Sequence, residues 1–184
     1  AGAIVRAAPV LTSGFPLNDG GLFASMVDEV LGHGWGIPPA ITYNDLDAPF
    51  AYPPLMFLVA AGLETVLPLG TVEWLRWIPL VASTVTIPAF ALLAMVLAPS
   101  RIHAVIATFA FALVPRSFEW MVMGGGLTRA PGFLLAILSI YLGIRFLNTG
   151  GRAWLGVGYP LGHPGLAHPR PGLYPPLTLK RPTH

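Results

Sequence analysis

Residues 78–98 form an apolar run without a single charged side chain, and no other feature of the chain limits its fold as strongly. As an α-helix this run would be roughly 31 Å long, at about 1.5 Å per residue, which matches the hydrocarbon thickness of a bilayer. Trp74 and Trp77 precede it, where amphipathic rings favour the headgroup level, and Arg101 follows it. The run therefore predicts a transmembrane helix over about residues 77–98.

The composition of the whole chain also favours a lipid environment. Of its 184 residues, 54% are hydrophobic and only 10% are charged, whereas soluble domains carry about 25% charged residues. A soluble chain of this length could not bury so much apolar surface. The formal net charge of +2 is too small to indicate a nucleic-acid partner, and the absence of cysteine excludes disulfides and thiolate metal ligands.

Three further apolar runs predict an all-α, polytopic transmembrane helix bundle of about four spans. The additional spans cover about residues 54–69, 102–123 and 129–147. The run at 102–123 is interrupted, because Pro115 breaks it and the glycines at 124–126 end it. Irregular backbone at membrane depth is tolerated only where it lines a cavity or is buried in protein. We therefore predict an interrupted or re-entrant segment at this point.

The stretch 13–53, ahead of the first full span, predicts a surface loop that contains its own helix. Apolar residues recur at four-residue spacing between positions 21 and 35 and form one face of a helical wheel. Such a face is typical of an amphipathic helix that lies in the plane of the membrane interface. Residues 1–11 are too short to span and carry Arg6 in their middle, so they predict the end of a longer helix or an interfacial stub.

The character of the chain changes after residue 149. Residues 150–184 hold seven of the 20 prolines, four basic side chains and no acidic one. Repeated proline prevents both regular helix and central strand, so we predict a transmembrane part at 1–149 and a disordered, mildly basic tail at 150–184. A bundle of this kind would not be expected to stop after four spans, and we interpret the chain as a fragment.

Asp19 is the first candidate site residue. It lies between a proline-terminated stub and two glycines, where other backbone can approach it closely. A carboxylate there can act as a general base toward an acceptor hydroxyl, or it can bind a divalent cation such as Mg²⁺ or Mn²⁺. The alternative is a purely structural role, in which Asp19 caps the helix that follows it.

A second candidate site comprises Gly125, Thr128 and Arg129, where three glycines precede a hydroxyl and a guanidinium. Free N–H groups, a hydroxyl and a guanidinium suit a lipid phosphate. The plainer interpretation is a flexible turn with an arginine that reaches the interface at a helix start. Nearby, Glu119 with Arg116 forms either a polar pair inside the membrane or a pair of ordinary solvated charges.

The order of these motifs resembles a known family. Asp-Gly-Gly-Leu-Phe at 19–23, the amphipathic stretch and Tyr-Pro-Pro-Leu at 52–55 are similar to the amino-terminal part of the GT-C superfamily, which comprises polytopic membrane glycosyltransferases. Members often show Asp-Glu after the first span and Lys- or His-Pro-Pro-Leu at the start of the next one. The resemblance covers roughly residues 5–147, with Gly20 in place of the common Glu and Tyr52 in place of the common Lys or His.

The resemblance implies a fragment of an enzyme of the bacterial inner membrane that moves a sugar from a polyprenyl-phosphate donor to an acceptor hydroxyl. Asp19 would be the catalytic base or a metal ligand. The residues expected to bind the substrate are Arg129, Thr128, Gly125, Tyr52 and Glu119. Two alternatives stay open, namely a non-enzymatic subunit that packs against other transmembrane helices and a transporter fragment whose broken segment lines the path.

Overall fold

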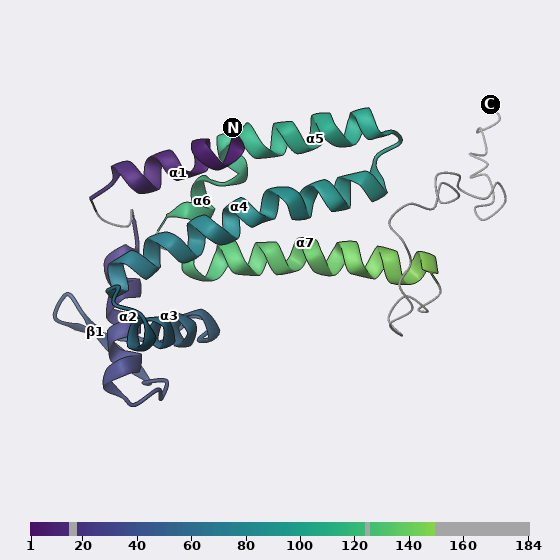
Figure 1. The fold of residues 1–184 in the computed structure, drawn as a ribbon. Coiled ribbons are helices and arrows are strands. Elements are labelled where there is room, and N and C mark those ends of the chain that lie inside the picture. Colours follow the sequence, from purple (N-terminus) through teal and green to yellow (C-terminus); the bar gives the residue numbers. More distant parts are fainter. Residues whose placement is uncertain (15–17, 124–125, 150–184) are drawn as a thin grey trace, which may run out of the picture. The chain divides into compact units, whose positions relative to one another are not determined.

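The computed structural model describes residues 1–14, 18–123 and 126–149, and this part of the chain is mostly helical, as predicted (Figure 1). The α-helices are α1 (Gly2–Thr12), α2 (Gly20–Gly32), α3 (Leu55–Val66), α4 (Thr71–Leu97), α5 (Arg101–Leu113), α6 (Glu119–Val122) and α7 (Gly126–Thr149). The remaining elements are the strands β1 (Ala40–Tyr43) and β2 (Leu46–Pro49) and the 3₁₀ turn η1 (Pro115–Ser117).

The chain divides into two compact units, Ala1–Arg145 and Phe146–His184. The first unit contains every element except the end of α7. Of the second unit the structure describes residues 146–149, which complete α7. The disordered tail predicted at 150–184 lies outside the described residues.

Two helices in the described part of the chain, α4 and α7, are long and apolar enough to cross a membrane. They coincide with the spans predicted at 77–98 and 129–147. The other two predicted spans are shorter than a bilayer crossing: α3 has 12 residues and α5 has 13, or roughly 18 Å and 20 Å of helix. The span predicted at 102–123 is interrupted as expected, because α5 ends at Leu113 and η1 and α6 follow it.

The helix α4 begins at Thr71, several residues before the predicted start, and this corrects the position of one tryptophan. Trp74 is buried, and its indole N–H donates a hydrogen bond of 3.1 Å to the carbonyl oxygen of Leu69. It belongs to the protein core, whereas Trp77 remains exposed. Of the two rings predicted at the headgroup level, only Trp77 is free to contact lipid.

Between α2 and α3 the sequence analysis predicted only a loop, but the chain forms a β-hairpin there. The strands β1 and β2 are antiparallel, and Tyr43 pairs with Leu46 across the turn. Asn44 and Asp45 both have positive φ angles, of 54° and 60°. Two consecutive residues with positive φ form the two-residue hairpin turn whose twist matches that of the flanking strands. Asn and Asp tolerate this conformation better than most residues.

The apolar face of α2, which the interfacial prediction placed against lipid, is covered by protein, and the position of α2 in the plane of the membrane interface stays a prediction. Phe23, Met26, Val27 and Val30 of α2 form one core with residues of α3, of α4 and of the hairpin. Phe23 stacks on Phe57 of α3 with ring centroids 5.3 Å apart. Burial of such side chains stabilises the fold by about 1.5–3 kcal/mol each. Most of the predicted first loop therefore forms a packed subdomain together with α3, and we call it the first-loop subdomain (residues 18–71).

A second core joins the long helices. Ala89 and Leu93 of α4 pack with Ile137 of α7, and Phe111 of α5 stacks on Phe90 of α4 at a centroid distance of 4.3 Å. The helices α4 and α5 run side by side in opposite directions (Figure 1). The other face of α5 is bare and apolar. Its most exposed large side chains are Ile102, Val105, Ile106 and Phe109, at 62–71% exposure.

Candidate functional site

Arg6, which sequence reasoning left inside an apolar stub, is the most completely buried charged side chain in the described residues, at 1% exposure. It extends from α1 into the junction of α4, α5 and η1. One terminal nitrogen, Nη1, donates to the carbonyl oxygen and to the hydroxyl of Ser83, at 2.6 Å and 2.8 Å. The other, Nη2, donates to the carbonyl oxygen of Phe111 at 3.1 Å and lies 3.4 Å from Oγ of Ser117.

The carbonyl of Phe111 needs such a partner because of the proline that follows it. In a continuous helix this oxygen would accept a bond from the N–H of residue 115, and Pro115 has none. Val114 still donates to Ala110 at 2.9 Å, so the helical ladder stops one step later. Arg6 and the hydroxyl of Ser117, which lies 2.6 Å away, occupy the place of the missing donor.

The charge of Arg6 is balanced without a carboxylate. No acidic side chain lies within ion-pair distance of it in the part of the chain that the structure describes. Instead, the guanidinium lies over the rings of Phe111 and Phe118, 5.1 Å from each centroid. Its Nε is buried without a hydrogen-bond partner. A single arginine in an otherwise apolar helix was the sequence signal for this site.

Next to this junction, α6 brings together two of the charged residues that the sequence analysis singled out. Arg116 pairs with Glu119 at 3.1 Å, and its side chain is 80% exposed. The guanidinium of Arg129, from the first turn of α7, lies 5.8 Å from the centroid of the Trp120 ring. Glu119 and Trp120 are consecutive, so two arginines interact with neighbouring residues of one short helix, one through an ion pair and one through a cation–π contact. We call Arg116, Glu119, Trp120 and Arg129 the arginine cluster.

The other residues predicted around Arg129 are placed less completely. Thr128 is half-buried at the start of α7. Gly125 lies outside the described residues. Gly126 is buried, and a Cβ there would collide with the carbonyl group of Met121 and lie 3.1 Å from Cβ of Pro79. The absence of a side chain at 126 is therefore what lets α7 start directly against α6 and α4.

Asp19 occupies the capping position of α2, but its side chain makes no capping hydrogen bond. Only its carbonyl takes part in the helix, by accepting a bond of 3.0 Å from the N–H of Phe23. The half-buried carboxylate is thus not used by the helix end. Among the described residues no group of three or more His, Cys, Asp or Glu could hold a metal ion. Binding of Mg²⁺ or Mn²⁺ at Asp19 stays a prediction.

Tyr52 packs against Phe23, which lies about one helical turn after Asp19 in α2. Its ring contacts Phe23 at a centroid distance of 4.8 Å and Phe57 at 6.5 Å. From the hairpin, the hydroxyl of Tyr43 lies against the backbone of Gly21, where an added Cβ would be 3.1 Å from it. Two aromatic residues of the first-loop subdomain therefore surround the start of α2.

One core connects the two predicted sites. Leu127, two residues before Arg129, is fully buried in the same cluster as Phe23, which lies four residues after Asp19. The helices that carry Asp19 and Arg129 are therefore both anchored in the same hydrophobic core. No hydrogen bond or ion pair joins Asp19 to Arg129 within the described ranges.

The first-loop subdomain also contains a polar contact that sequence reasoning did not find. The hydroxyl of Thr71 lies 2.8 Å from Oδ1 of Asp28 and 2.6 Å from Oε2 of Glu64. One hydroxyl proton can serve only one of these carboxylates at a time. The contact joins α2 to the end of α3 and to the start of α4.

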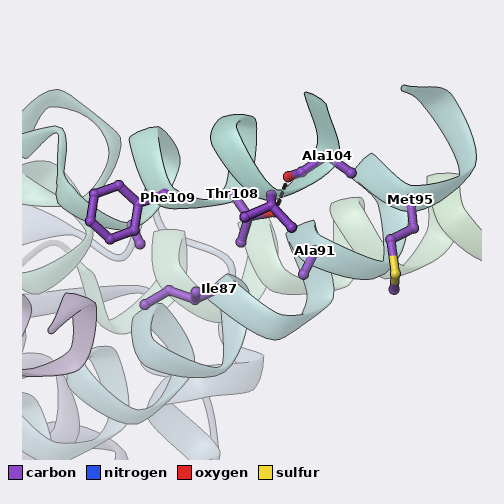
Figure 2. A pocket seen from close by; sticks show the side chains of 8 residues that line it. Ile87, Ala91, Met95, Ala104, Thr108 and Phe109 are labelled. Carbon is purple, nitrogen blue, oxygen red and sulfur yellow. Dashed lines mark hydrogen bonds between the residues drawn. The ribbon is translucent and has the colours of Figure 1, made fainter. Parts of the chain in front are cut away.

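An apolar groove of about 310 Å³ lies between α4 and α5 (Figure 2). Its one hydroxyl, that of Thr108, donates to the carbonyl of Ala104 at 2.7 Å and is not free for a ligand. Gly2 of α1 lies against two of its lining residues, because a Cβ added there would be 2.9 Å from Cβ of Ala112 and 3.0 Å from Cδ1 of Ile87. The groove offers shape and apolar surface but no polar group.

Comparison with protein-family models, with curated proteins and with solved structures gave no match for this chain.

Proposed function

We propose that this chain is part of an integral membrane protein that binds a polyprenyl phosphate at the arginine cluster and transfers the sugar it carries to an acceptor hydroxyl. The observation that carries the proposal is the attachment of two arginines to consecutive residues of α6, at the start of a helix long enough to cross a membrane. The GT-C-like order of motifs and the common core of the two predicted sites support the same function.

The proposed membrane arrangement uses α4 and α7 as full spans. The helix α3 and the broken segment from α5 to α6 would complete a bundle of about four spans, with bacterial inner membrane as its location. Support comes from the bare apolar face of α5 and from α7, whose most apolar window is only 11% buried. Apolar surfaces of this kind are stable in contact with lipid.

The geometry of Arg129 suits a phosphate. A guanidinium that lies over an aromatic ring contacts the ring with its planar face. The N–H groups at the edge of the guanidinium then stay available for a bidentate contact with a phosphate. In the described ranges no carboxylate pairs with Arg129, whereas Glu119 already pairs with Arg116. The cluster has two positive charges and one negative charge, and its net charge of +1 favours an anionic headgroup.

Asp19 would act as the general base in this proposal. It would accept the proton of the acceptor hydroxyl while that oxygen bonds to the anomeric carbon of the sugar, and the bond from this carbon to the phosphate oxygen would break. The phosphate would leave as an anion bound by Arg129. Support comes from the side chain of Asp19, which is not engaged in capping α2.

Binding of a phosphate by Arg129 is tested with a short, soluble polyprenyl phosphate. We expect the purified protein in neutral detergent to bind farnesyl phosphate more tightly than farnesol by isothermal titration calorimetry. Because a charged hydrogen-bond donor is removed, Arg129→Met should weaken farnesyl phosphate binding by about tenfold to a hundredfold. Arg101→Met is the matched control, since Arg101 is an exposed arginine at the start of α5, and it should leave binding unchanged. Equal affinity for the phosphate and the alcohol would exclude the proposed function.

A second candidate function is a membrane subunit without catalytic activity. The groove between α4 and α5 favours it, because Ala91, Ala104 and Ala112 are among its lining residues and small residues allow close helix contact in membranes. In that case the bare face of α5 would contact a helix of another chain. A protein with this function would tolerate substitution of Asp19 and Arg129.

A further inference from the structure

We infer that Arg6 is a positioning residue for the arginine cluster. Together with the hydroxyl of Ser117, its guanidinium replaces the N–H that Pro115 lacks, and it thereby fixes the direction of α6, which carries Glu119 and Trp120. The role of the cluster as a phosphate site rests on the proposed function. The placement of α6 by Arg6 does not.

The contacts of Arg6 lie on both sides of the break at Pro115, where α5 has ended and η1 begins. Before Pro115 it bonds to the carbonyl of Phe111 at 3.1 Å, and after it the guanidinium lies near Oγ of Ser117 and over the ring of Phe118. The next residue is Glu119. The break is therefore held at its two ends by one side chain that is itself anchored to Ser83 of α4 at 2.6 Å.

A purely structural role explains Arg6 less well. Joining α1 to α4 and α5 requires only apolar packing, and a buried charge is less favourable than an apolar side chain of similar size. The distinctive contribution of a guanidinium is several donors in a rigid plane, which can reach the carbonyls of two helices at once. The partners of Arg6 are the carbonyls of Ser83 and Phe111, and Phe111 is the residue that Pro115 deprives of its donor.

A double-mutant cycle tests whether Arg6 stands in for the missing N–H. Pro115→Ala restores an N–H for the carbonyl of Phe111. We expect Arg6→Met to raise the unfolding equilibrium constant in detergent by about tenfold or more in the wild-type background, because the carbonyl of Phe111 loses a charged donor and keeps only the hydroxyl of Ser117. In the P115A background the same substitution should raise it at least about threefold less, because the bonds to Ser83 are lost in both backgrounds while the carbonyl of Phe111 has an N–H donor again. Equal effects in the two backgrounds would refute this part of the inference.

A spectroscopic signal tests the positioning of α6. With 5-fluorotryptophan incorporated, the five tryptophans give separate ¹⁹F resonances, and Trp120→Phe identifies that of Trp120. Arg129→Met should move this resonance because the cation leaves the ring. We expect Arg6→Met to move it in the same direction, and R6M/P115A to leave it displaced although the carbonyl of Phe111 has regained an N–H donor. A Trp120 resonance that Arg6→Met does not move would overturn the inference.

Arg76→Met is the matched control. Arg76 also joins α1 to α4, through a bond of 3.0 Å from Nη2 to the carbonyl of Ser13, but it does not contact the break. It should lower stability without moving the Trp120 resonance or weakening farnesyl phosphate binding. Displacement of the resonance by both variants would show general loosening and count against the inference. If wild-type protein does not prefer the phosphate, the proposed function fails, while the cycle and the resonance still decide the role of Arg6.

Discussion

Replacing Asp19 by Asn is expected to abolish sugar transfer while the protein stays in the membrane at its normal level. The substitution keeps size and shape but removes the group that would accept a proton, and a general base typically contributes about 10²–10⁴-fold to the rate. Folding should be unaffected, since the side chain of Asp19 makes no capping hydrogen bond to α2. The measurement is transfer of label from tritiated polyprenyl-phosphate hexoses to an acceptor fraction, in membranes that contain the full-length protein.

Asp45→Asn is the control for this substitution. Asp45 lies in the same loop, is exposed and has a φ angle of 60° that Asn also tolerates, so transfer should stay normal. Loss of both transfer and protein level in D19N would indicate a capping role alone. Normal transfer in D19N would exclude the base. An activity that depends on Glu119 and not on Asp19 would favour the transporter, and indifference to both would favour the non-enzymatic subunit.

The elements that follow from local pattern could be predicted from the sequence. The uncharged run at 78–98 determines most of α4, and the four-residue spacing after position 21 determines α2. Periodicity shows that α2 has an apolar face, but it cannot show what covers that face. The cover comes from α3, whose Phe57 lies more than thirty positions away from Phe23. The prediction that this face contacts lipid was therefore wrong for a physical reason.

The hairpin was missed although its signal is local. Asn44-Asp45 between the short apolar stretches of β1 and β2 is a pair that suits a two-residue turn with positive φ. Each of the two strands has only four residues. Strands of this length carry too few alternating positions for period-two patterning to be recognised.

The candidate site shows the same division between local and distant signals. Glycines, proline and charges near position 120 marked the arginine cluster, and the Arg116–Glu119 pair is a contact between residues three apart. The junction at Arg6 could not be predicted, because its partners Ser83 and Phe111 lie 77 and 105 positions away. No spacing rule reaches over such separations. The only sequence signal for this junction was the presence of a charged residue, Arg6, within an apolar stretch.

The largest effect on stability is expected from a single methyl group at position 126. Gly126→Ala places a Cβ against the carbonyl group of Met121 and 3.1 Å from Cβ of Pro79. Neither neighbour is the free end of a flexible side chain, so α6 or α7 must shift. Overpacking of this kind costs about 1–3 kcal/mol, and a backbone collision lies at the upper end of that range. The measurement is the free energy of unfolding in detergent.

Gly132→Ala supplies the contrast on the same helix. A Cβ at Gly132 meets no atom within 4 Å, and alanine is the better helix former by about 0.8–1.0 kcal/mol, so this variant should be as stable as wild type or more stable. Because α7 carries Arg129 one turn after Gly126, G126A should also displace the guanidinium from the Trp120 ring and weaken farnesyl phosphate binding. Wild-type stability in G126A would show that α6 does not pack against the start of α7, and the arginine cluster would then lose its structural basis.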